Sequence, residues 1–251
     1  MTALLEGKIA VITGSSRSIG AAIAKHMGQQ GAKVVVNYVN DAKAADEVVS
    51  TIKSVNGGTA VAIKADVSTV AGGQHLIDEA VKAFGGIDIL VLNAGIMGSK
   101  VLEDIYEAFY DAHFATNVKG PLFLAKAVAP LLPAPGGRVI FFSTSLTRFS
   151  MVKPNALVYA ATKGAVEQIS RILAKDLGAR GITVNTVSPG PVDTPLFRQG
   201  KPQQLIDTIA KFAPSGRLGA VEDIAPVVSF LASPAAQWVN GQNIPVNGGY
   251  A

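Results

Sequence analysis

The stretch KIAVITGSSRSIG, residues 8–20, decides the fold. It begins as a short apolar run, continues as a turn rich in glycine and serine, and leads into AAIAKHMGQQG (21–31), which has the apolar spacing of a helix. A glycine-rich turn that opens a helix presents free backbone N–H groups and the positive helix end, which together hold a pyrophosphate. The letters alone are a weak signal, but their place after a first buried strand predicts a dinucleotide site.

Six further runs of the same apolar kind alternate with segments of helical spacing: 33–38, 59–66, 87–93, 138–143, 182–188 and 242–249. Most are almost continuously apolar instead of alternating, which is typical of strands buried on both faces of a parallel sheet. Repeated strand–helix–strand units predict an α/β fold. We therefore expect residues 1–251 to form one Rossmann-type domain, a doubly wound parallel sheet of about seven strands with helices on both faces.

The composition of the 251 residues indicates a globular protein with a large core, since 49% are apolar and 16% charged. The net charge of +4 comes from scattered lysines and arginines, which argues against a nucleic-acid partner. The chain has no cysteine, no signal-peptide pattern and no apolar run of membrane-spanning length, so we expect a cytoplasmic protein. His26, His75 and His113 lack ligand spacing, which predicts helix-surface histidines and no catalytic metal.

Six motifs lie in register with the predicted strands: TGSSRSIG (13–20), LNAG (92–95), TNVKG (116–120), FFSTS (141–145), YAATK (159–163) and VSPGPVDT (187–194). Together they resemble the short-chain dehydrogenase/reductase family over essentially the whole chain. Ser18 departs from the family pattern by replacing the middle glycine of the turn, and Leu92 by replacing an asparagine. Because serine cannot take every conformation open to glycine, we expect a slightly altered turn or a hydroxyl that bonds a phosphate.

Tyr159 and Lys163 are four residues apart, so on a helix they project to the same side. The resemblance implies that Tyr159 is the general acid/base and that Lys163 also holds the cofactor ribose. The lysine ammonium, helped by the positive nicotinamide of the oxidised cofactor, would stabilise tyrosinate and lower a tyrosine pKa that is otherwise near 10. Such a tyrosine exchanges a proton with a carbonyl or alcohol near neutral pH.

In the family, a serine about thirteen residues before the tyrosine polarises the substrate oxygen. Counting forward from the strand start reaches Thr144, whereas counting back from Tyr159 reaches Leu146, so the loop has extra residues. Ser145 is the first choice, because some fungal naphthol reductases of the family use its spacing from the tyrosine. Ser143 is the second choice and Thr144 the third.

Asn117 is the fourth member by resemblance, in a helix that the family bends so that a backbone carbonyl holds a water beside the lysine. Pro121 supplies a physical reason for the bend, because it lacks the N–H that would bond the carbonyl of Asn117. The sequence thus predicts a proton relay from solvent through water and Lys163 to Tyr159. The alternative is an asparagine that only caps a helix break.

The second strand ends without an acid, and an acid there would bond the ribose of NAD and repel the phosphate of NADP. Asn37 and Tyr38 occupy this region, Asp41 comes later, and Arg17 in the glycine turn is placed to meet a 2′-phosphate. We therefore expect NADP(H) in preference to NAD(H). With the contacts that the resemblance implies, the expected cofactor set is Gly14, Ser16, Arg17, Ser18, Ile19, Gly20, Asn37, Tyr38, Asp66, Val67, Asn93, Ala94, Gly95, Tyr159, Lys163, Pro189, Gly190, Val192 and Thr194.

The irregular segment 190–211 follows a strand end and is the expected substrate-covering loop. The family implies a small-molecule carbonyl or secondary alcohol as substrate. Five residues suggest an apolar or aromatic ketone: Phe149, Met151, Leu157, Leu196 and Phe197. The stretches VVVNYVND and VYAATKGAVE are similar to those of polyhydroxynaphthalene reductases and related ketoreductases, and bacterial glucose dehydrogenases and acyl-carrier-protein reductases share similar motifs.

Two classes of function stay open. The first is an NADP(H)-dependent oxidoreductase that interconverts a ketone or aldehyde and an alcohol, with a sugar or secondary-alcohol dehydrogenase as a variant. The second is a regulatory protein that binds NADP and has lost turnover, because a fold does not guarantee chemistry. The intact Tyr159, Lys163 and Asn117 favour the first. The family is usually tetrameric, and the apolar stretches 123–132 and 165–177 suit either a homotetramer or packing on the sheet.

Overall fold

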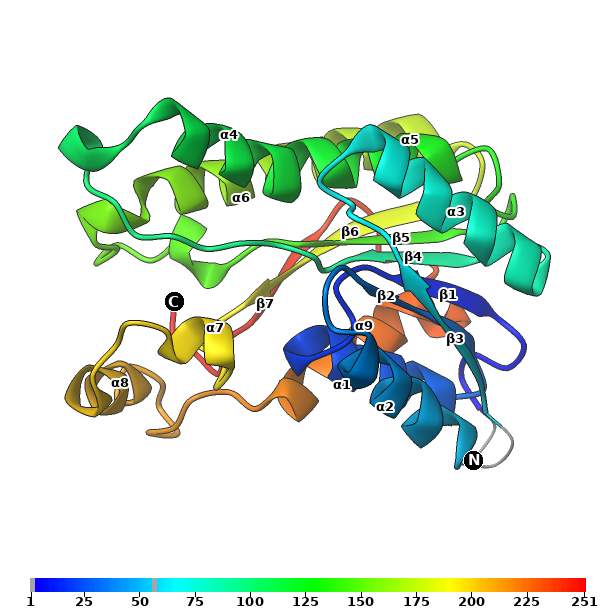
Figure 1. Cartoon of the computed structure of the whole chain (residues 1–251), viewed down its shortest axis with the longest axis horizontal. Coiled ribbons are helices and arrows are strands. Elements are labelled where there is room, and N and C mark those ends of the chain that lie inside the picture. Colours follow the sequence, from blue (N-terminus) through cyan, green and yellow to red (C-terminus); the bar gives the residue numbers. More distant parts are fainter. Residues whose placement is uncertain (1–2, 56–57) are drawn as a thin grey trace.

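The computed structural model describes residues 3–55 and 58–251 and contains a seven-stranded sheet (Figure 1). Neighbouring strands are parallel, in the order β3-β2-β1-β4-β5-β6-β7. The strands are β1 (Ile9–Ile12), β2 (Lys33–Tyr38), β3 (Thr59–Lys64), β4 (Ile89–Leu92), β5 (Arg138–Phe142), β6 (Thr183–Pro189) and β7 (Asn243–Val246). The predicted doubly wound parallel sheet of about seven strands is confirmed.

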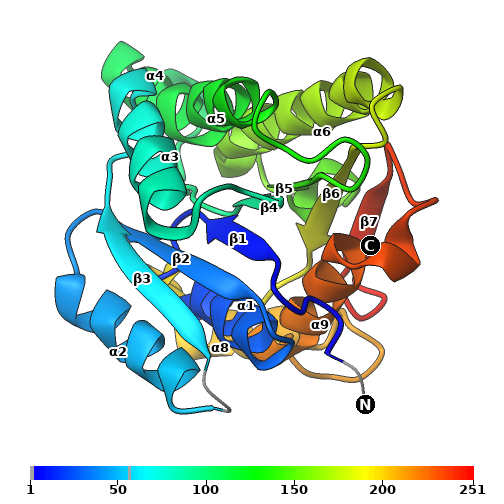
Figure 2. The same cartoon turned by 90° about the vertical axis from the view of Figure 1, so that its right-hand side faces the viewer.

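Helices cover both faces of the sheet, as Figures 1 and 2 show. One face carries α1 (Ser18–Gln29), α2 (Ala42–Lys53) and α9 (Val221–Ala232). The other carries α3 (Val70–Phe84), α4 (Glu107–Phe114), α5 (Gly120–Val128) and α6 (Leu157–Gly178). Two short helices, α7 (Pro195–Arg198) and α8 (Gln203–Ala210), follow β6 within the segment that was expected to be irregular.

The sheet separates two hydrophobic cores, which explains the continuous apolar runs. Within β1, Ile12 packs into the core under α1 and α9, while Val11 packs into the core under α3 and α5, and both are fully buried. In β2, Val36 and Val35 divide between the two cores in the same way. Because helices cover both faces of the sheet, neither face meets water, and the strands have no need to alternate apolar and polar side chains.

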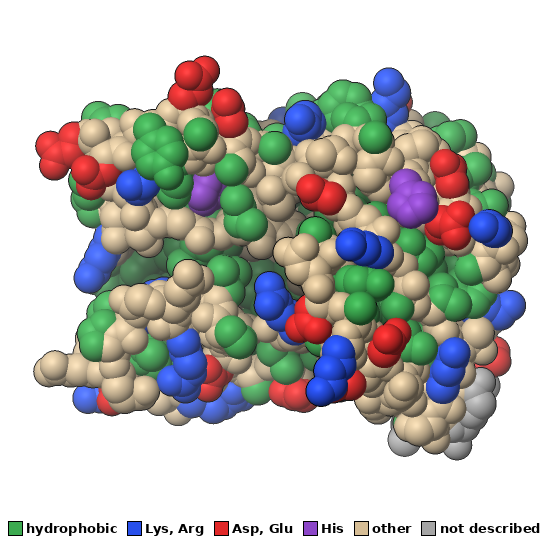
Figure 3. Space-filling model, viewed as in Figure 1, with side chains coloured by type: hydrophobic (Ala, Val, Ile, Leu, Met, Phe, Trp, Pro, Cys, Tyr) green, Lys and Arg blue, Asp and Glu red, His purple; other side chains and the backbone are tan. Residues whose placement is uncertain are grey.

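The order of the strands places a crevice at their carboxyl ends. The chain builds outward from β1 to β3 and then returns to the other side of β1 to add β4, so the connections after β1 and β4 diverge there. Figure 3 shows a hollow at this end of the molecule, between the side formed by α4 and α6 and the side formed by α7 and α8. The motifs from the sequence lie around this end.

Candidate active site

The glycine turn between β1 and α1 packs tightly against the end of β4. Gly14 has a φ of +61°, which favours glycine. A Cβ on Gly20 would lie 2.4 Å from the Gly14 carbonyl oxygen and 2.6 Å from Asn93 Nδ2. That Nδ2 donates to the carbonyl oxygens of Thr13 (2.9 Å) and Gly14 (3.1 Å). Glycine at position 20 is therefore required by the backbone, and Asn93 braces the turn instead of pointing freely into the crevice.

Ser18 has a left-handed backbone conformation, which favours glycine. Its φ is +52°, and no other non-glycine residue in the described ranges has a positive φ. Whether the turn differs from that of the family, or the hydroxyl bonds a phosphate, stays a prediction. The cost is steric, since Cβ approaches the following carbonyl in the left-handed region, at about 1–2 kcal/mol.

Asn37 supports the turn from below and does not face the crevice. Its side chain is 1% exposed, its Oδ1 accepts from Gly14 N (3.0 Å), and its Nδ2 donates to the Ala65 carbonyl (3.0 Å). Its place in the cofactor set is thus corrected to an indirect one. Asp41 is also engaged, because its carboxylate accepts from Ala44 N (3.0 Å) as the N-cap of α2.

The end of β2 therefore offers no carboxylate that is free to bond a ribose. Tyr38 is half-buried there. Arg17, in the glycine turn, is exposed and makes no capping hydrogen bond with α1, while Ser16 and Ile19 beside it are half-buried. The exposed guanidinium of Arg17 and the use of Asp41 as a helix cap suit a ribose that carries a 2′-phosphate better than an unmodified ribose.

The segments after β3 and β4 lie on either side of the glycine turn, since the strand order is β3-β2-β1-β4. Asp66 is exposed after β3 and accepts from Ser68 N (3.0 Å) through one oxygen, and Val67 beside it is buried. After β4, Ala94 N donates to Thr13 Oγ1 (3.0 Å). The contact of Ala94 with Thr13 joins the end of β4 to the glycine turn.

Gly95 joins the cofactor wall to the catalytic residues. A Cβ there would lie 3.2 Å from Asn117 Oδ1 and 3.4 Å from Lys163 Nζ. Any larger side chain would therefore push into the polar cluster that the sequence singled out.

Asn117 lies in a π-helical turn, Ala115–Lys119, between α4 and α5. Gly120 N donates to the Ala115 carbonyl five residues earlier, and Pro121 has no N–H to offer to Asn117. The local bend that Pro121 predicts is confirmed. The asparagine is 1% exposed, and its Oδ1 accepts from Ile96 N while its Nδ2 donates to the Ile96 carbonyl, both at 2.9 Å.

Tyr159 and Lys163 lie one turn apart near the start of α6. Lys163 is 4% exposed, its Nζ donates to the Phe142 carbonyl (2.9 Å), and Nζ lies 5.9 Å from the centre of the Tyr159 ring. Burial lowers the pKa of Lys163 to about 8. Burial raises the pKa of Tyr159 to about 12, partly offset by a side-chain hydrogen bond with Thr144. The expected lowering of the tyrosine pKa requires the bound oxidised cofactor as well as the lysine, and it stays a prediction.

The three candidate hydroxyls after β5 point to three different partners. Ser143 Oγ donates to Glu167 Oε1 (2.6 Å), and Thr147 Oγ1 donates to the same oxygen (2.7 Å). Ser145 Oγ donates to the Ser188 carbonyl at 3.3 Å. Thr144 Oγ1 accepts from Leu146 N (3.3 Å), and its side chain is the one of the three that lowers the pKa of Tyr159.

Glu167 is a site residue that the sequence reasoning missed. It follows Lys163 by four residues on α6, so the helical spacing that linked Tyr159 to Lys163 could also have included it. By accepting from Ser143 and Thr147, its carboxylate fixes the loop that carries Thr144.

The predicted nicotinamide clamp follows β6. Gly190 N donates to the Val246 carbonyl (3.0 Å), and a Cβ on Gly190 would lie 2.8 Å from Asn247 Cα. Val192 forms a bridge with Gly219, and Thr194 caps α7 by accepting from Phe197 N (3.1 Å). Pro189, which ends β6, starts this rigid path toward α7.

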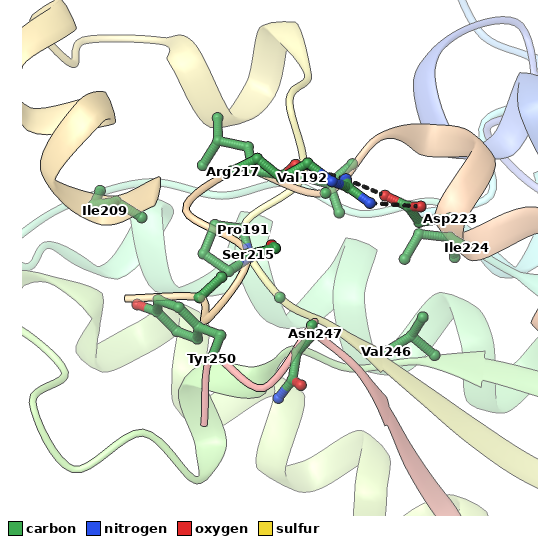
Figure 4. A pocket seen from close by; sticks show the side chains of 15 residues that line it. Pro191, Val192, Ile209, Ser215, Arg217, Asp223, Ile224, Val246, Asn247 and Tyr250 are labelled. Carbon is green, nitrogen blue, oxygen red and sulfur yellow. Dashed lines mark hydrogen bonds and ion pairs between the residues drawn. The ribbon is translucent and has the colours of Figure 1, made fainter. Parts of the chain in front are cut away.

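Behind the clamp lies a small cavity of about 170 Å³, shown in Figure 4. Pro191 and Val192 line one side and Tyr250 another, while the Arg217–Asp223 ion pair (2.6 Å) closes one end. The cavity includes no catalytic candidate. We therefore assign it to the packing of the clamp against the C-terminal segment.

An aromatic cluster ties the segment around α8 to the C-terminus. Phe149 stacks on Tyr250 with ring centres 4.5 Å apart, and Phe212 meets both rings edge-on. Of the other expected pocket residues, Met151, Leu157 and Leu196 are exposed, and Phe197 receives Lys201 Nζ 4.8 Å from its ring centre.

The histidines do not form a metal site, and in the described part of the chain no group of three or more His, Cys, Asp or Glu is placed to hold a metal ion. His75 is exposed as predicted, but His113 is 4% exposed and its Nδ1 bonds the Phe109 carbonyl (2.7 Å), so the prediction of a surface position was wrong. His26 is half-buried against Ser229 Oγ (2.7 Å). Among the helices of residues 3–55 and 58–251, none combines the length and apolarity of a membrane span.

The fold, together with the cluster of Tyr159, Lys163 and Asn117, defines a site of the class found in nucleotide-dependent oxidoreductases. A family model described as enoyl-(acyl carrier protein) reductase matches residues 14–251. A short-chain dehydrogenase/reductase from Aspergillus novofumigatus is 42% identical over 98% of this chain and 97% of its own length. The chain belongs to the short-chain dehydrogenase/reductase family.

Several relatives carry more specific names. An NADPH-dependent aldehyde reductase-like protein from Arabidopsis thaliana is 42% identical, covering 98% of this chain and 95% of the relative. A probable tetrahydroxynaphthalene reductase from Zymoseptoria tritici is 41% identical over 98% and 96%. A short-chain dehydrogenase from Burkholderia cenocepacia, solved in complex with NADP, superposes with a TM-score of 0.92 at 36% identity, covering 98% of this chain and 99% of that one.

Proposed function

We propose that this chain interconverts a ketone or aldehyde and an alcohol with NADP(H), and that Tyr159 is the proton donor and acceptor. The observation that carries the proposal is the convergence of Tyr159, Lys163 and Asn117 beside the glycine turn. A Cβ on Gly95 would meet both the asparagine (3.2 Å) and the lysine (3.4 Å), so the predicted cofactor wall and the polar cluster are adjacent. A protein that only binds nucleotide has no use for a tyrosine one turn before a buried lysine at this point.

The crevice fits NADP. The close approach of Gly20 to Gly14 packs the glycine turn tightly at the start of α1, where a pyrophosphate would meet the helix end. Arg17 would hold the 2′-phosphate, because Asn37 is buried and Asp41 caps α2. The NADPH dependence in the name of the Arabidopsis relative and the NADP in the Burkholderia structure support this choice. When bound, NADP(H) supplies or accepts the hydride.

Tyr159 keeps its proton at neutral pH and so is ready to donate it to a carbonyl oxygen. Its pKa of about 12 means that almost every molecule carries the proton before reduction. As negative charge develops on the substrate oxygen, the proton moves from the phenol to that oxygen, and the ammonium of Lys163 stabilises the phenolate left behind.

Thr144, and not the first choice Ser145, is the group that we propose to polarise the carbonyl. Its side chain lies close enough to Tyr159 to lower the pKa of that phenol, so an oxygen that accepts from the tyrosine would lie within reach of both hydroxyls. Ser143 is held by Glu167, and the Ser145 hydroxyl donates to the Ser188 carbonyl. Counting residues favoured Ser145, but the direction of each side chain favours Thr144.

Lys163 also restores the proton of Tyr159. With a pKa of about 8, its ammonium exchanges protons readily near neutral pH. The π turn at Ala115–Lys119 and Pro121 deprive the Asn117 carbonyl of its usual α-helical partner, which suits it to accept from a water between lysine and solvent. This supports the predicted relay from solvent to the active site.

The substrate that we propose is an apolar or aromatic ketone. The hollow in Figure 3 has apolar side chains on its floor. The aromatic cluster of Phe149, Phe212 and Tyr250 holds the segment around α8, which we expect to cover the hollow. The tetrahydroxynaphthalene reductase name of one relative points in the same direction. Residues 190–211, with α7 and α8, would close over such a ligand.

The test is NADPH consumption with a panel of aromatic, aliphatic and keto-ester carbonyls, plus an enoyl thioester for the double-bond reduction named by the family model. NADPH should be used much faster than NADH, and Arg17→Ala should reduce that preference. Thr144→Val should lose at least about a hundredfold in kcat/KM, while Thr144→Ser retains activity. If Ser145→Ala lost kcat/KM and Thr144→Val did not, Ser145 would be the group that polarises the carbonyl.

We also propose that the chain forms a homotetramer. Apolar side chains stand exposed on the outer helices: Tyr110 on α4, Leu122 and Phe123 on α5, and Ile172 on α6. Such a surface is typical of a subunit interface. Light scattering after size-exclusion chromatography should give four times the mass of the 25.9 kDa chain, and a stable monomer would contradict it.

A further inference from the structure

A second cavity, larger than the one behind the clamp, lies at the amino-terminal edge of the sheet, opposite the active site. Its volume is about 590 Å³, within the range of small-molecule pockets. The first residues of β4, β5 and β6 line it, together with the end of α6 and the segment between α9 and β7. Figure 2 faces this end of the molecule and shows the ends of α6 and α9 beside β6 and β7. The proposed oxidoreductase chemistry uses none of these residues.

The cavity is lined by cations. Lys8, Arg138 and Lys175 face it, and none of its fifteen lining residues is an aspartate or glutamate. Lys8 is already paired with Asp88 at 3.2 Å, next to the lining. Arg138 and Lys175 are in no ion pair within the described ranges. Two positive charges thus remain for a ligand.

Arg138 is the more unusual of the two, because a buried guanidinium normally has an anionic partner. It is 5% exposed, its Nη1 donates to the Gly137 carbonyl (3.0 Å), and its buried Nε has no hydrogen-bond partner. A guanidinium has five N–H donors in a planar fork that matches an oxyanion. An oxyanion in the cavity would be the anionic partner that this guanidinium lacks.

Trp238 adds an aromatic face to the same cavity. It is the one tryptophan of the chain and is 98% exposed, although it lines the pocket with Gln237 and Asn240. The cavity is also larger than a phosphate ion needs. Both facts indicate a ligand with an organic part beside its anionic group.

We propose that this cavity binds a phosphorylated small molecule, with its phosphate on Arg138 and Lys175 and its organic part against Trp238. A phosphate monoester carries a charge of about −1.5 to −2 at neutral pH, which matches the two unpaired cations. Because this edge is opposite the carboxyl ends of the strands, the ligand does not compete with NADP(H) or with the carbonyl substrate.

Trp238 makes the test direct, since its fluorescence reports on the cavity alone. The full-length protein, saturated with NADP⁺ to block the cofactor site, is titrated with phenyl phosphate and with inorganic phosphate, against chloride at equal ionic strength. We expect a saturable change with both, and tighter binding of phenyl phosphate. Equal affinity for the two ligands would refute the role of Trp238.

Two variants test the cations. Arg138→Gln and Lys175→Gln should each weaken phenyl phosphate binding by about tenfold or more. Lys53→Gln is the matched control, because Lys53 is the basic residue in the last turn of α2 as Lys175 is in that of α6. Lys175 is exposed on its helix, so its variant keeps the test valid if Arg138→Gln fails to fold.

The outcomes separate this site from the active site. NADPH turnover by Lys175→Gln should equal that of the wild type, and its thermal stabilisation by phenyl phosphate should be lost. Absence of any fluorescence or thermal response to phosphate in the wild type would overturn the proposal, as would equal responses in wild type and both cation variants. Neither result bears on whether Tyr159 is catalytic.

Discussion

Replacing Lys163 by methionine should stabilise the protein at neutral pH while abolishing its activity. The lysine is 4% exposed and its ammonium bonds the Phe142 carbonyl, with no carboxylate in contact. Burial lowers its pKa from 10.5 to about 8. That fall corresponds to about 3 kcal/mol of desolvation, which the wild type bears at neutral pH and the Lys163→Met variant does not.

The pH dependence follows from the same shift. Below pH 8 the folded and unfolded chains both hold the lysine proton, whereas between pH 8 and 10.5 only the unfolded chain holds it, so wild-type stability rises with pH. Tyr159 acts in the opposite sense above pH 10, because the folded protein retains a proton up to about pH 12 that the unfolded chain has lost. The difference between wild type and Lys163→Met should therefore shrink mainly between pH 8 and 10.

Urea unfolding of wild type and Lys163→Met across this pH range measures the effect. The variant should be more stable by up to about 3 kcal/mol at neutral pH, and the two should converge as the pH approaches 10. A Lys163→Met variant that is less stable than wild type at neutral pH, with a parallel pH profile, would refute the reasoning. It would mean that the ammonium is compensated in the fold and is not held at a cost.

Three further predictions concern the tyrosine and the glycine turn. Tyr159→Phe should lower kcat by about 10²–10⁴-fold with NADPH affinity nearly unchanged, as fluorescence titration and steady-state kinetics will show. Gly20→Ala should cost about 1–3 kcal/mol of stability in thermal melts and weaken NADPH binding, because its Cβ would meet the Gly14 carbonyl oxygen. Gly164→Ala is the control, since nothing lies within 4 Å of its Cβ, and it should be neutral or stabilising in the same melts. Ser18→Gly should raise stability by up to about 1 kcal/mol, and a lower melting temperature would contradict the strain inferred from its φ of +52°.

The sheet and the position of the site were predictable because they depend on local patterns. Continuous apolar runs identified strands buried on both faces, and the order of the motifs placed Tyr159 and Lys163 at the crevice. Pro121 predicted the bend at Asn117, because the missing N–H is a property of one residue. These features do not depend on how distant side chains meet.

The features that the sequence could not provide depend on side-chain direction or on distant segments. Asn37 could be read as facing the cofactor, but its amide is used up between the glycine turn and the end of β3. Counting residues in a loop of altered length favoured Ser145, whereas the proximity of Thr144 to Tyr159, which lowers the tyrosine pKa, appears only in three dimensions. The burial of His113 and the cavity around Arg138 arise where several separate segments meet.

The most direct test of the central claim is hydride transfer itself. NADPH deuterated at the transferred position is incubated with the protein and the best aromatic ketone of the panel, and the alcohol is analysed by mass spectrometry. Wild type should deliver a single deuterium to the carbinol carbon, and Tyr159→Phe, with NADPH bound, should yield almost no alcohol. An unlabelled alcohol, or full transfer by Tyr159→Phe, would contradict a mechanism in which this tyrosine supplies the proton.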